Sequence, residues 1–397
     1  MDINIQRKID LYAGTLICRL ISLFSGRKEI YSHKPKNILV ILLSEMGSLV
    51  LARPMFDRLK IKYPDAKIYG LLFEQNRIML ELIDAIPKEN ILTVSNQSFG
   101  KMMFTSIQAF MQMRRKNIDT VIDCELFSRI SSIFSFFSGA EIRVGFHRHK
   151  QEGLYRGDFI NRPVLYNPYH HIFQQFITLA ESIESHGTPR VKRNAANEAP
   201  EQPRIHFSAF EIEQIRGRFF SDFPHIVQKK IVLMYPSGGL LPIRAWPLKQ
   251  YCNVAEELIA KGYAVGIIGM PADKELAKTI QAHCNHDDCI DLTGYTETVR
   301  ELMVIFHFTS LLITNDGGPG HFAAMTPIPS IIFYGPETPV LYGPLTANTC
   351  IFYQSLSCSP CLTAYNHRNS PCDGDNRCLI DIRSEDVVKK AVEMLER

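Results

Sequence analysis

The residues with the most evident chemistry lie in a Gly-rich turn that follows an apolar run at residues 311–314, a predicted buried strand. The turn contains Asp316, Gly317, Gly318, Pro319, Gly320 and His321. Because glycine and proline leave the first N–H groups of the next helix uncovered, this helix start can bind a diphosphate. Asp316 could accept a hydrogen bond from a ribose hydroxyl or orient the turn. The alternative interpretation is an ordinary strand–turn–helix with a capping aspartate.

Downstream motifs favour the diphosphate interpretation. Ile328-Pro329 precedes an apolar run and Tyr334-Gly335-Pro336, and Tyr342-Gly343-Pro344 follows. Together with residues 311–325, these motifs resemble the signature of the family 9 glycosyltransferases, the ADP-heptose:lipopolysaccharide heptosyltransferases. The resemblance extends from about residue 37 to residue 382. It implies an enzyme that takes ADP-heptose, or a similar nucleotide sugar, as its donor.

Strand and helix patterns predict an α/β fold with two domains. Apolar strand candidates alternate with helical stretches at residues 37–43, 66–73, 91–94 and 120–123, and then at 230–234, 264–268, 289–292, 311–314 and 330–333. Such alternation predicts parallel sheets covered by helices on both faces. A polar, Pro-containing segment at residues 187–204 predicts a linker.

The resemblance adds an architecture to this pattern: the glycosyltransferase B-type fold, in which two Rossmann-like domains with parallel sheets face a cleft. Residues 31–186 would form the N-terminal, acceptor-side domain, and residues 205–383 the nucleotide-sugar domain. A last helix, at residues 384–397, would pack back on the N-terminal domain.

Composition excludes some classes of protein. The chain has 397 residues, enough for two domains, and its 46% hydrophobic and 21% charged residues are typical of a folded globular protein. A formal net charge of +3 and a single tryptophan give no argument for nucleic-acid binding. No apolar run reaches the length of a transmembrane helix.

The first 30 residues predict an amphipathic helix with flanking arginine and lysine residues. Arg19 interrupts the apolar run, and no small-residue cleavage site follows, so a signal peptide is not expected. We expect the helix to lie on an anionic membrane surface. The alternative is a helix packed on the protein's own surface. With the resemblance, this pattern predicts a cytoplasmic protein peripheral to the inner face of the inner membrane.

The donor should bind beyond the carboxyl ends of the C-terminal strands. Ser237 and Gly238 follow one predicted strand, and Asp273 follows the next. The resemblance assigns diphosphate contact to Arg244, whose guanidinium can clamp phosphate oxygens without a catalytic metal. The alternatives are a surface arginine for Arg244 and a helix N-cap for Asp273.

Inverting sugar transfer needs a base that removes the proton of the acceptor hydroxyl. Many family members place an aspartate at the end of a Met-Gly-Asp motif, where this chain has Ser48. An unassisted hydroxyl stays protonated, so we expect Glu45, three residues earlier, to be the base. Alternatively, Glu45 only caps the following helix and the protein binds a nucleotide sugar without turning it over. Asp123 is a reserve candidate for the base.

An anionic acceptor would need cations in the N-terminal domain. A basic cluster is formed by Arg143, His147, Arg148, His149, Lys150 and Arg156. Arg143 belongs to an Arg-x-Gly element that the family also has, which makes it the preferred acceptor contact. The alternative is a solvated charged surface. His170 and His171, at a predicted helix start, are expected to pack or cap.

Four cysteines have the spacing C-x2-C-x10-C-x5-C: Cys358, Cys361, Cys372 and Cys378. Four thiolates favour zinc or iron in a closed structural site. Some protein-directed heptosyltransferases that resemble this family carry iron on four cysteines. The alternative is free or disulfide-paired thiols. With no secretory signal, a reducing compartment is expected, and the other six cysteines are predicted to be structural or inert.

The sequence therefore predicts an inverting transferase that moves heptose from ADP-heptose to a lipid-linked glycan, the lipopolysaccharide core or a related cell-envelope glycan. A protein hydroxyl as the acceptor and a non-catalytic sugar-nucleotide-binding protein are the alternatives.

Overall fold

The computed structural model describes residues 3–24, 34–43, 45–147, 154–185, 191–194 and 204–397. The chain divides into two compact units. The N-terminal unit comprises Met1–Glu201 and Ala364–His367, and the C-terminal unit comprises Gln202–Thr363 and Arg368–Arg397. The boundary between them falls within the segment predicted as a linker.

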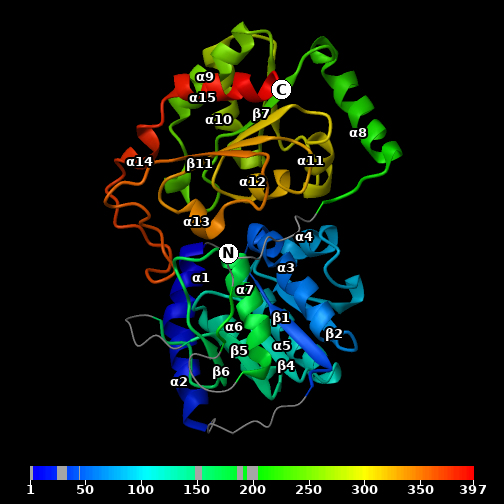
Figure 1. Cartoon of the computed structure of the whole chain (residues 1–397), viewed down its shortest axis with the longest axis vertical. Helices are drawn as coiled ribbons and strands as arrows, with labels where there is room; N and C mark the ends of the chain where they lie inside the picture. The colour runs from blue at the N-terminus through cyan, green and yellow to red at the C-terminus, as the bar shows by residue number, and fades with distance from the viewer. Residues whose placement is uncertain (1–2, 25–33, 44, 148–153, 186–190, 195–203) are drawn as a thin grey trace. The chain divides into compact units, whose positions relative to one another are not determined.

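The N-terminal unit is built on a six-stranded parallel sheet with the order β3-β2-β1-β4-β5-β6 (Figure 1). Its strands are β1 (Asn37–Ile41), β2 (Lys67–Phe73), β3 (Ile91–Val94), β4 (Thr120–Asp123), β5 (Ile142–Phe146) and β6 (Arg162–Val164). Helices cover the sheet, so β1 and β4 are buried almost throughout. This burial explains the continuous apolar run at residues 38–41 of β1.

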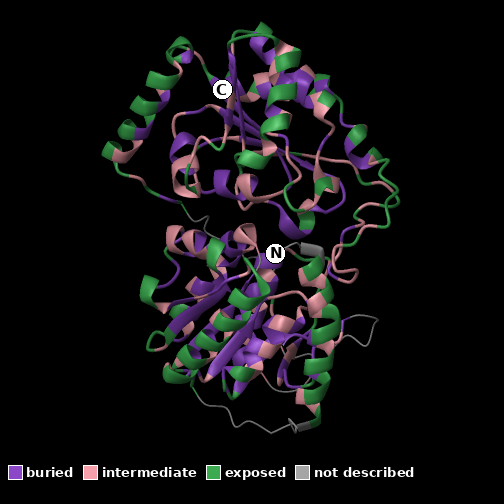
Figure 2. Ribbon diagram, turned by 180° about the vertical axis from the view of Figure 1, so that it is seen from behind, coloured by how far each residue is buried: buried purple, intermediate pink, exposed green. Residues whose placement is uncertain are grey.

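The helices of this unit cover the sheet and leave their outer sides exposed (Figure 2). They are α1 (Ile3–Ile9), the π-helical turn η1 (Asp10–Gly14), α2 (Thr15–Phe24), α3 (Met46–Lys62), α4 (Arg77–Leu82), α5 (Phe99–Arg115), α6 (Arg129–Phe137) and α7 (Ile172–Glu181), with short 3₁₀ turns at Glu74–Asn76, Lys88–Asn90 and Ser182–Glu184. Helix α3 packs on α7, and α5 contacts α6 through the rings of Phe110 and Phe134, whose centroids are 5.0 Å apart. The α2 segment also packs on α6.

The C-terminal unit repeats this design with the order β12-β11-β10-β7-β8-β9, again with every strand pair parallel. Its strands are β7 (Ile231–Tyr235), β8 (Ala264–Gly269), β9 (Cys289–Thr293), β10 (Leu311–Asn315), β11 (Ser330–Tyr334) and β12 (Thr349–Tyr353). Its helices are α8 (Ala209–Asp222), α9 (Leu248–Ala260), α10 (Lys274–Cys284), α11 (Val299–Ile305), α12 (Gly318–Ala323), α13 (Pro339–Tyr342), α14 (Arg377–Ile380) and α15 (Ser384–Leu395), with 3₁₀ turns η5 (Pro224–Ile226), η6 (Pro242–Arg244) and η7 (Pro271–Asp273).

Helix α15 corrects one expectation from the sequence. It was expected to pack on the N-terminal domain, but it packs on α9 within the C-terminal unit. The physical reason is its apolar stripe: Val387, Ala391 and Leu395 recur every fourth residue and are buried in the core of this unit.

Each sheet reverses its strand order once. The reversal lies between β1 and β4 in the N-terminal unit, and between β7 and β10 in the C-terminal unit. Ligands of open parallel sheets bind beyond the carboxyl ends of the strands at such a reversal. The loops after these four strands are therefore the places to look for functional side chains.

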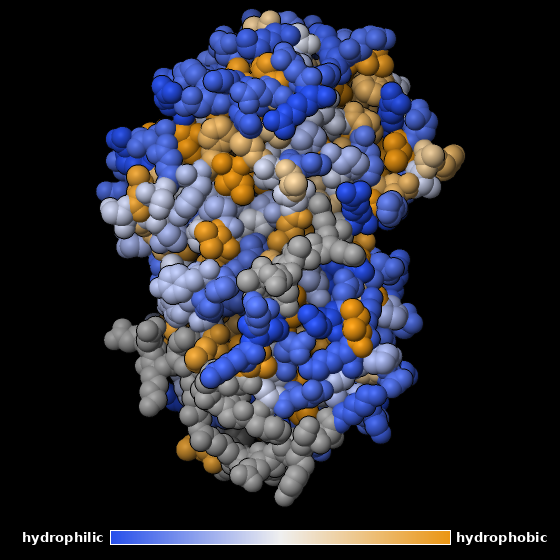
Figure 3. All heavy atoms as spheres, in the orientation of Figure 1, coloured by the Kyte–Doolittle hydropathy of each residue, from blue (hydrophilic) through white to orange (hydrophobic). Residues whose placement is uncertain are grey.

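The surface seen in Figure 3 is largely hydrophilic, with separate apolar patches. Among the residues that the structure describes, no helix is long and apolar enough to cross a bilayer.

Candidate active site

Asn315, the last residue of β10, joins two loops at the strand reversal of the C-terminal unit. Its side-chain nitrogen donates to the carbonyls of Pro236, at 3.0 Å, and Ser237, at 3.1 Å, in the loop after β7. Its side-chain oxygen accepts from the amide of Trp246, at 2.8 Å, and the hydroxyl of Tyr251, at 3.1 Å. Because Asn315 is buried, these bonds fix the loops around the reversal. The sequence signal was an amide residue ending an otherwise apolar strand, and it was missed.

Arg244 lies between two carboxylates in this region. Its Nη2 is 2.9 Å from a carboxylate oxygen of Glu337, and its Nε is 3.6 Å from one of Asp316. The Arg244 side chain is 14% exposed, so it is not the surface arginine of the alternative interpretation. We call Arg244, Asp316 and Glu337 the Arg244 cluster. Its members come from the loops after β7, β10 and β11, which are neighbours in the sheet.

Burial and charge oppose each other in the Arg244 cluster. Burial alone would lower the pKa of Arg244, but the charges of Glu337 and Asp316 raise it above its ordinary value. Burial raises the pKa of Asp316, although Arg244 opposes that shift. Burial likewise raises the pKa of Glu337 to about 7, against the pull of Arg244. Arg244 therefore stays charged, whereas the carboxylates are the groups that can take up a proton.

Glu337 was not among the predicted site residues. Its side chain is 3% exposed and follows the Tyr-Gly-Pro segment at the end of β11. A buried glutamate needs a cationic partner, and Arg244 is one. The available signal was a glutamate next to the family-like Gly-Pro motif.

The other predicted donor residues line the same edge of the sheet. The Ser237 hydroxyl accepts from the amide of Gly239 at 3.2 Å. A side chain at Gly238 would come within 2.8 Å of the Leu241 carbonyl, so only glycine fits this turn. The Asp273 carboxylate accepts from the Met270 amide at 2.8 Å. Asp273 stands at the N-cap position of α10, but its side chain makes no capping bond to that helix, and its contact with the donor stays a prediction.

The Gly-rich turn leads into α12, as predicted. Gly317 precedes the helix, Gly318, Pro319 and Gly320 form its first turn, and buried His321 follows. The helix has six residues, so its dipole is short. The charge for holding a diphosphate therefore has to come mainly from side chains such as Arg244.

In the N-terminal unit, Glu45 and Ser48 meet at the start of α3, beyond β1. The Ser48 hydroxyl donates to the Glu45 carboxylate at 3.0 Å. Glu45 occupies the N-cap position, but its side chain makes no capping bond to the helix amides. The helix-capping alternative for this side chain is therefore not supported. The pair instead presents a partly exposed carboxylate oriented by a hydroxyl.

The surroundings of Asp123 exclude it as the catalytic base. They also exclude Arg156 from contact with an acceptor. Both side chains are fully buried and form an ion pair, with the Ser131 hydroxyl donating to the same carboxylate at 3.0 Å. A carboxylate held in this way cannot meet an acceptor. The prediction that Arg156 belongs to an acceptor-binding cluster is therefore wrong, because its guanidinium is buried and paired with Asp123.

The rest of the basic cluster is only partly described. The Arg143 guanidinium donates to the carbonyls of Phe159, at 2.7 Å, and Ala140, at 2.6 Å, and is half-buried. His147 is buried at the end of β5. Arg148, His149 and Lys150 lie outside the described residues. Acceptor contact by Arg143, His147 and Arg148 stays a prediction.

His170 and His171 make the local contacts that were expected from the sequence. His171 caps α7 by accepting from the amide of Phe173 at 3.3 Å, and His170 bonds to Gln174 at 3.3 Å.

Three of the four clustered cysteines affect the fourth, Cys378, through their charges. Burial, and then the charges of Cys361, Cys358 and Cys372, raise the pKa of Cys378 to about 11. However, no group of three or more side chains in the described part of the chain forms a metal-binding set. The donor types suit a metal, but the four thiols are not arranged as a metal-binding set in this structure.

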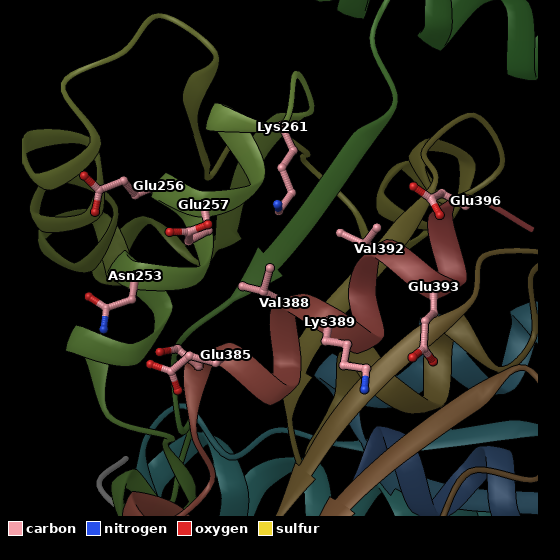
Figure 4. Close-up of a pocket in the computed structure, with 11 residues that line it drawn as sticks. Asn253, Glu256, Glu257, Lys261, Glu385, Val388, Lys389, Val392, Glu393 and Glu396 are labelled. Atoms are coloured by element: carbon pink, nitrogen blue, oxygen red, sulfur yellow. The ribbon is translucent and has the colours of Figure 1, made fainter.

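The cavity drawn in Figure 4 is separate from the Arg244 cluster. It has a volume of about 620 Å³ and lies between α9 and α15. Its lining includes five glutamates, among them Glu256 and Glu393, but only two lysines. An excess of carboxylates is unsuited to a diphosphate, and no residue of the Arg244 cluster lines the cavity.

Two parallel sheets of identical strand order, each with polar residues at its reversal, are the two Rossmann-like units of the B-type fold of glycosyltransferases. Comparison with known families gives the same result: the sequence model of glycosyltransferase family 9 (heptosyltransferase) matches residues 107–370. The chain belongs to this family.

Individual relatives are distant but match along most of their length. Lipooligosaccharide heptosyltransferase 2 of Haemophilus ducreyi is 24% identical over 320 residues, which cover 79% of this chain and 87% of that protein. Lipopolysaccharide heptosyltransferase 2 of Salmonella typhimurium is 24% identical over 364 residues, or 90% and 98% of the two chains. The solved structure of ADP-heptose lipopolysaccharide heptosyltransferase II of E. coli has a TM-score of 0.68 and 20% identity, and the match covers 91% of this chain and 98% of that one.

The raised pKa of Glu337 predicts a pH-dependent stability. Between pH 4.5, the ordinary pKa, and about 7, the folded state binds more protons at this residue than the unfolded state. The contribution of Glu337 to the free energy of unfolding therefore falls as pH rises through this window. Glu337→Gln should remove that fall. Urea unfolding at pH 5, 6 and 7, followed by the fluorescence of the single Trp246, would measure it.

Glu213→Gln is the matched control, because Glu213 is a 70% exposed glutamate of the same unit. It should keep the wild-type dependence on pH. An unchanged dependence in Glu337→Gln would contradict the assignment.

Proposed function

We propose that this protein is an inverting glycosyltransferase that transfers heptose from ADP-heptose to the lipopolysaccharide core or a related cell-envelope glycan. The observation that carries the proposal is the Arg244 cluster at the strand reversal of the C-terminal sheet, in a chain of family 9. The names of the distant relatives, lipooligosaccharide and lipopolysaccharide heptosyltransferases, support the choice of sugar and acceptor.

On the donor side, Arg244 would bind the diphosphate. Its guanidinium carries a permanent charge and several N–H donors in a fixed plane, which match phosphate oxygens. As the sugar leaves, negative charge grows on the departing ADP, and a fixed cation stabilises that charge. Asp316 and Glu337 hold the guanidinium in one place, so little reorganisation is needed during the reaction.

On the acceptor side, Glu45 would be the base. Its carboxylate removes the proton of the acceptor hydroxyl, the hydroxyl oxygen attacks the anomeric carbon, and the bond from that carbon to ADP breaks. Attack opposite the leaving group inverts the anomeric configuration. The hydrogen bond from Ser48, 3.0 Å long, would orient the carboxylate. Ser48 would therefore act as a positioning residue, in place of the aspartate that many family members have there.

Replacing Glu45 with glutamine should lower the turnover number by roughly a hundredfold to ten-thousandfold, the usual contribution of a general base. Glutamine can still accept the Ser48 hydrogen bond, so the fold should be preserved. The measurement is acceptor-dependent release of ADP from ADP-heptose with truncated lipopolysaccharide. Glu89→Gln, at an exposed glutamate of the same unit, is the control and should react as wild type. Full turnover by a folded Glu45→Gln protein would contradict the base assignment.

We also propose that the α1–α2 segment binds an anionic membrane surface. One side of the segment is docked on its own unit: Asp10 pairs with Arg129 at 3.1 Å, and Gly14 and Cys18 are buried. The opposite side exposes seven large apolar residues, namely Ile5, Leu11, Tyr12, Leu16, Ile17, Leu20 and Leu23. The docked side fits the alternative of a helix packed on the protein's own surface. The exposed side supports the proposal of membrane binding. The exposed apolar side, with Arg7, Lys8 and Arg19 in the same segment, suits a lipid interface.

The double variant Leu16→Glu/Leu20→Glu should reduce binding to vesicles that contain phosphatidylglycerol by at least about tenfold, because two apolar side chains lose their burial in lipid. Co-sedimentation would measure the partition coefficient. Phe210→Glu, at a 79% exposed apolar residue of the C-terminal unit, is the control and should bind like wild type. Equal binding by the double variant would argue against the membrane role of this segment.

The four-cysteine loop is proposed to bind one structural zinc or iron ion. The four cysteine side chains and their spacing, C-x2-C-x10-C-x5-C, support this proposal. Binding would require the four sulfurs to come to coordination distance from one ion. No step of sugar transfer depends on it.

Protein purified under reducing conditions should contain about one equivalent of zinc or iron, measured by elemental analysis. The Cys358→Ser/Cys372→Ser variant should lose it, because removing two of four ligands leaves too few for a closed site. Cys252→Ser, outside the cluster, should keep it. A reduced wild-type protein that binds neither metal would refute the proposal.

A further inference from the structure

Glu337 connects the Arg244 cluster to the four-cysteine loop, residues 358–378. Its carboxylate contacts two guanidinium groups: Nη2 of Arg244 at 2.9 Å and Nε of Arg368 at 3.2 Å. Arg368 belongs to the loop and lies between Cys361 and Cys372. One buried carboxylate thus holds an arginine from the loop after β7 beside an arginine from the cysteine loop.

A tight turn places the Arg368 side chain. His367 and Arg368 have φ angles of 51° and 57°, a left-handed conformation that is unfavourable for residues other than glycine. The amide of Arg368 donates to the carbonyl of Thr363 at 2.9 Å, which closes the turn. The guanidinium carbon lies 5.3 Å from the centroid of the Tyr342 ring, at the end of α13. The contacts to Glu337 and Tyr342 compensate for the strained backbone.

The four-cysteine loop is also hydrogen-bonded to the residues that directly precede Glu337 and Arg244. The amide of Cys361 donates to the carbonyl of Pro336, next to Glu337, at 2.9 Å. The side chain of Asn376 donates to the carbonyl of Ile243, the residue before Arg244, at 2.8 Å. These two bonds hold the four-cysteine loop beside the Arg244 cluster.

The positive charge of Arg368 changes the charge balance around Arg244. The Arg244 cluster alone sets one guanidinium against two carboxylates, and this net negative charge would repel a diphosphate. Arg368 adds a positive charge and makes the set of four neutral. Burial raises the pKa of Glu337 to about 7, so an arriving anion can favour its protonated form and leave the set positive.

We propose that Arg368 is a second diphosphate-binding residue of the donor site, delivered by the four-cysteine loop. The inference rests on the donor site proposed above. Two arginines side by side offer more N–H donors and more positive charge to the oxygens of the two phosphates than one guanidinium does. Glu337 is then a positioning residue that keeps the two guanidinium groups together.

Arg368→Ala should weaken the binding of ADP and of inorganic pyrophosphate by about tenfold to a hundredfold, the usual effect of losing hydrogen bonds to a charged group. Calorimetry on the full chain would measure both ligands, and pyrophosphate makes the test independent of the nucleoside. Arg368→Lys keeps the charge without the planar fork and should recover part of the affinity. Unfolding followed by Trp246 fluorescence checks that each variant is folded.

Arg377→Ala is the matched control, because Arg377 is a 59% exposed arginine of the same loop, paired with Asp381. It should bind both ligands as wild type does. Arg244→Ala separates the inference from the donor site itself. Loss of binding in Arg244→Ala but affinity within twofold of wild type in Arg368→Ala would overturn the role of Arg368 and leave the donor site standing. Unchanged binding in both variants would refute the donor site as well.

Discussion

The structure around the proposed donor site depends on the burial of a permanent charge. A guanidinium cannot lose its proton in a protein, so Arg244 requires carboxylates where water is excluded. Asp316 and Glu337 supply them from the ends of neighbouring strands. The strand order of the C-terminal sheet thus assembles the cluster, and Asn315 fixes the loops around it. Together with Arg368, which balances the second carboxylate, such a fixed cation suits the nucleoside diphosphate proposed as its ligand.

Much of the fold was predictable because its strands are buried on both faces. Strands such as β1 and β10 then read as continuous apolar runs, and their alternation with helices predicts a parallel sheet. The sequence reading missed β5, β6 and β12. Strand β6 has three residues and contains Pro163, and β12 is a half-exposed edge strand with a mixed pattern. The packing of α15 was wrong because an apolar stripe shows that a helix is buried but not which unit buries it.

The candidate site was predictable only where local motifs mark it. Arg244 and Asp316 lie in family-like segments, and the structure brings them together. Glu337 stands next to a family-like motif, but its pairing with Arg244 and with Arg368 joins segments far apart in the chain, which no local pattern encodes. The ion pair of Asp123 and Arg156 shows the opposite error: Asp123 was a reserve candidate for the base and Arg156 a member of the basic cluster, but these residues, 33 positions apart, form a buried pair. Glu45 and Ser48 stand three residues apart, so their hydrogen bond was accessible from the sequence.

The most direct test of this account is the product formed by the wild-type protein. Incubation with ADP-heptose and a truncated lipopolysaccharide acceptor should give a product that is heavier by one heptose, as measured by mass spectrometry. The new linkage should have an anomeric configuration opposite to that of the donor, as determined by NMR. A product of retained configuration would contradict the proposed single displacement. The absence of any product, across acceptors and with the protein shown to be folded, would contradict the proposed heptosyl transfer.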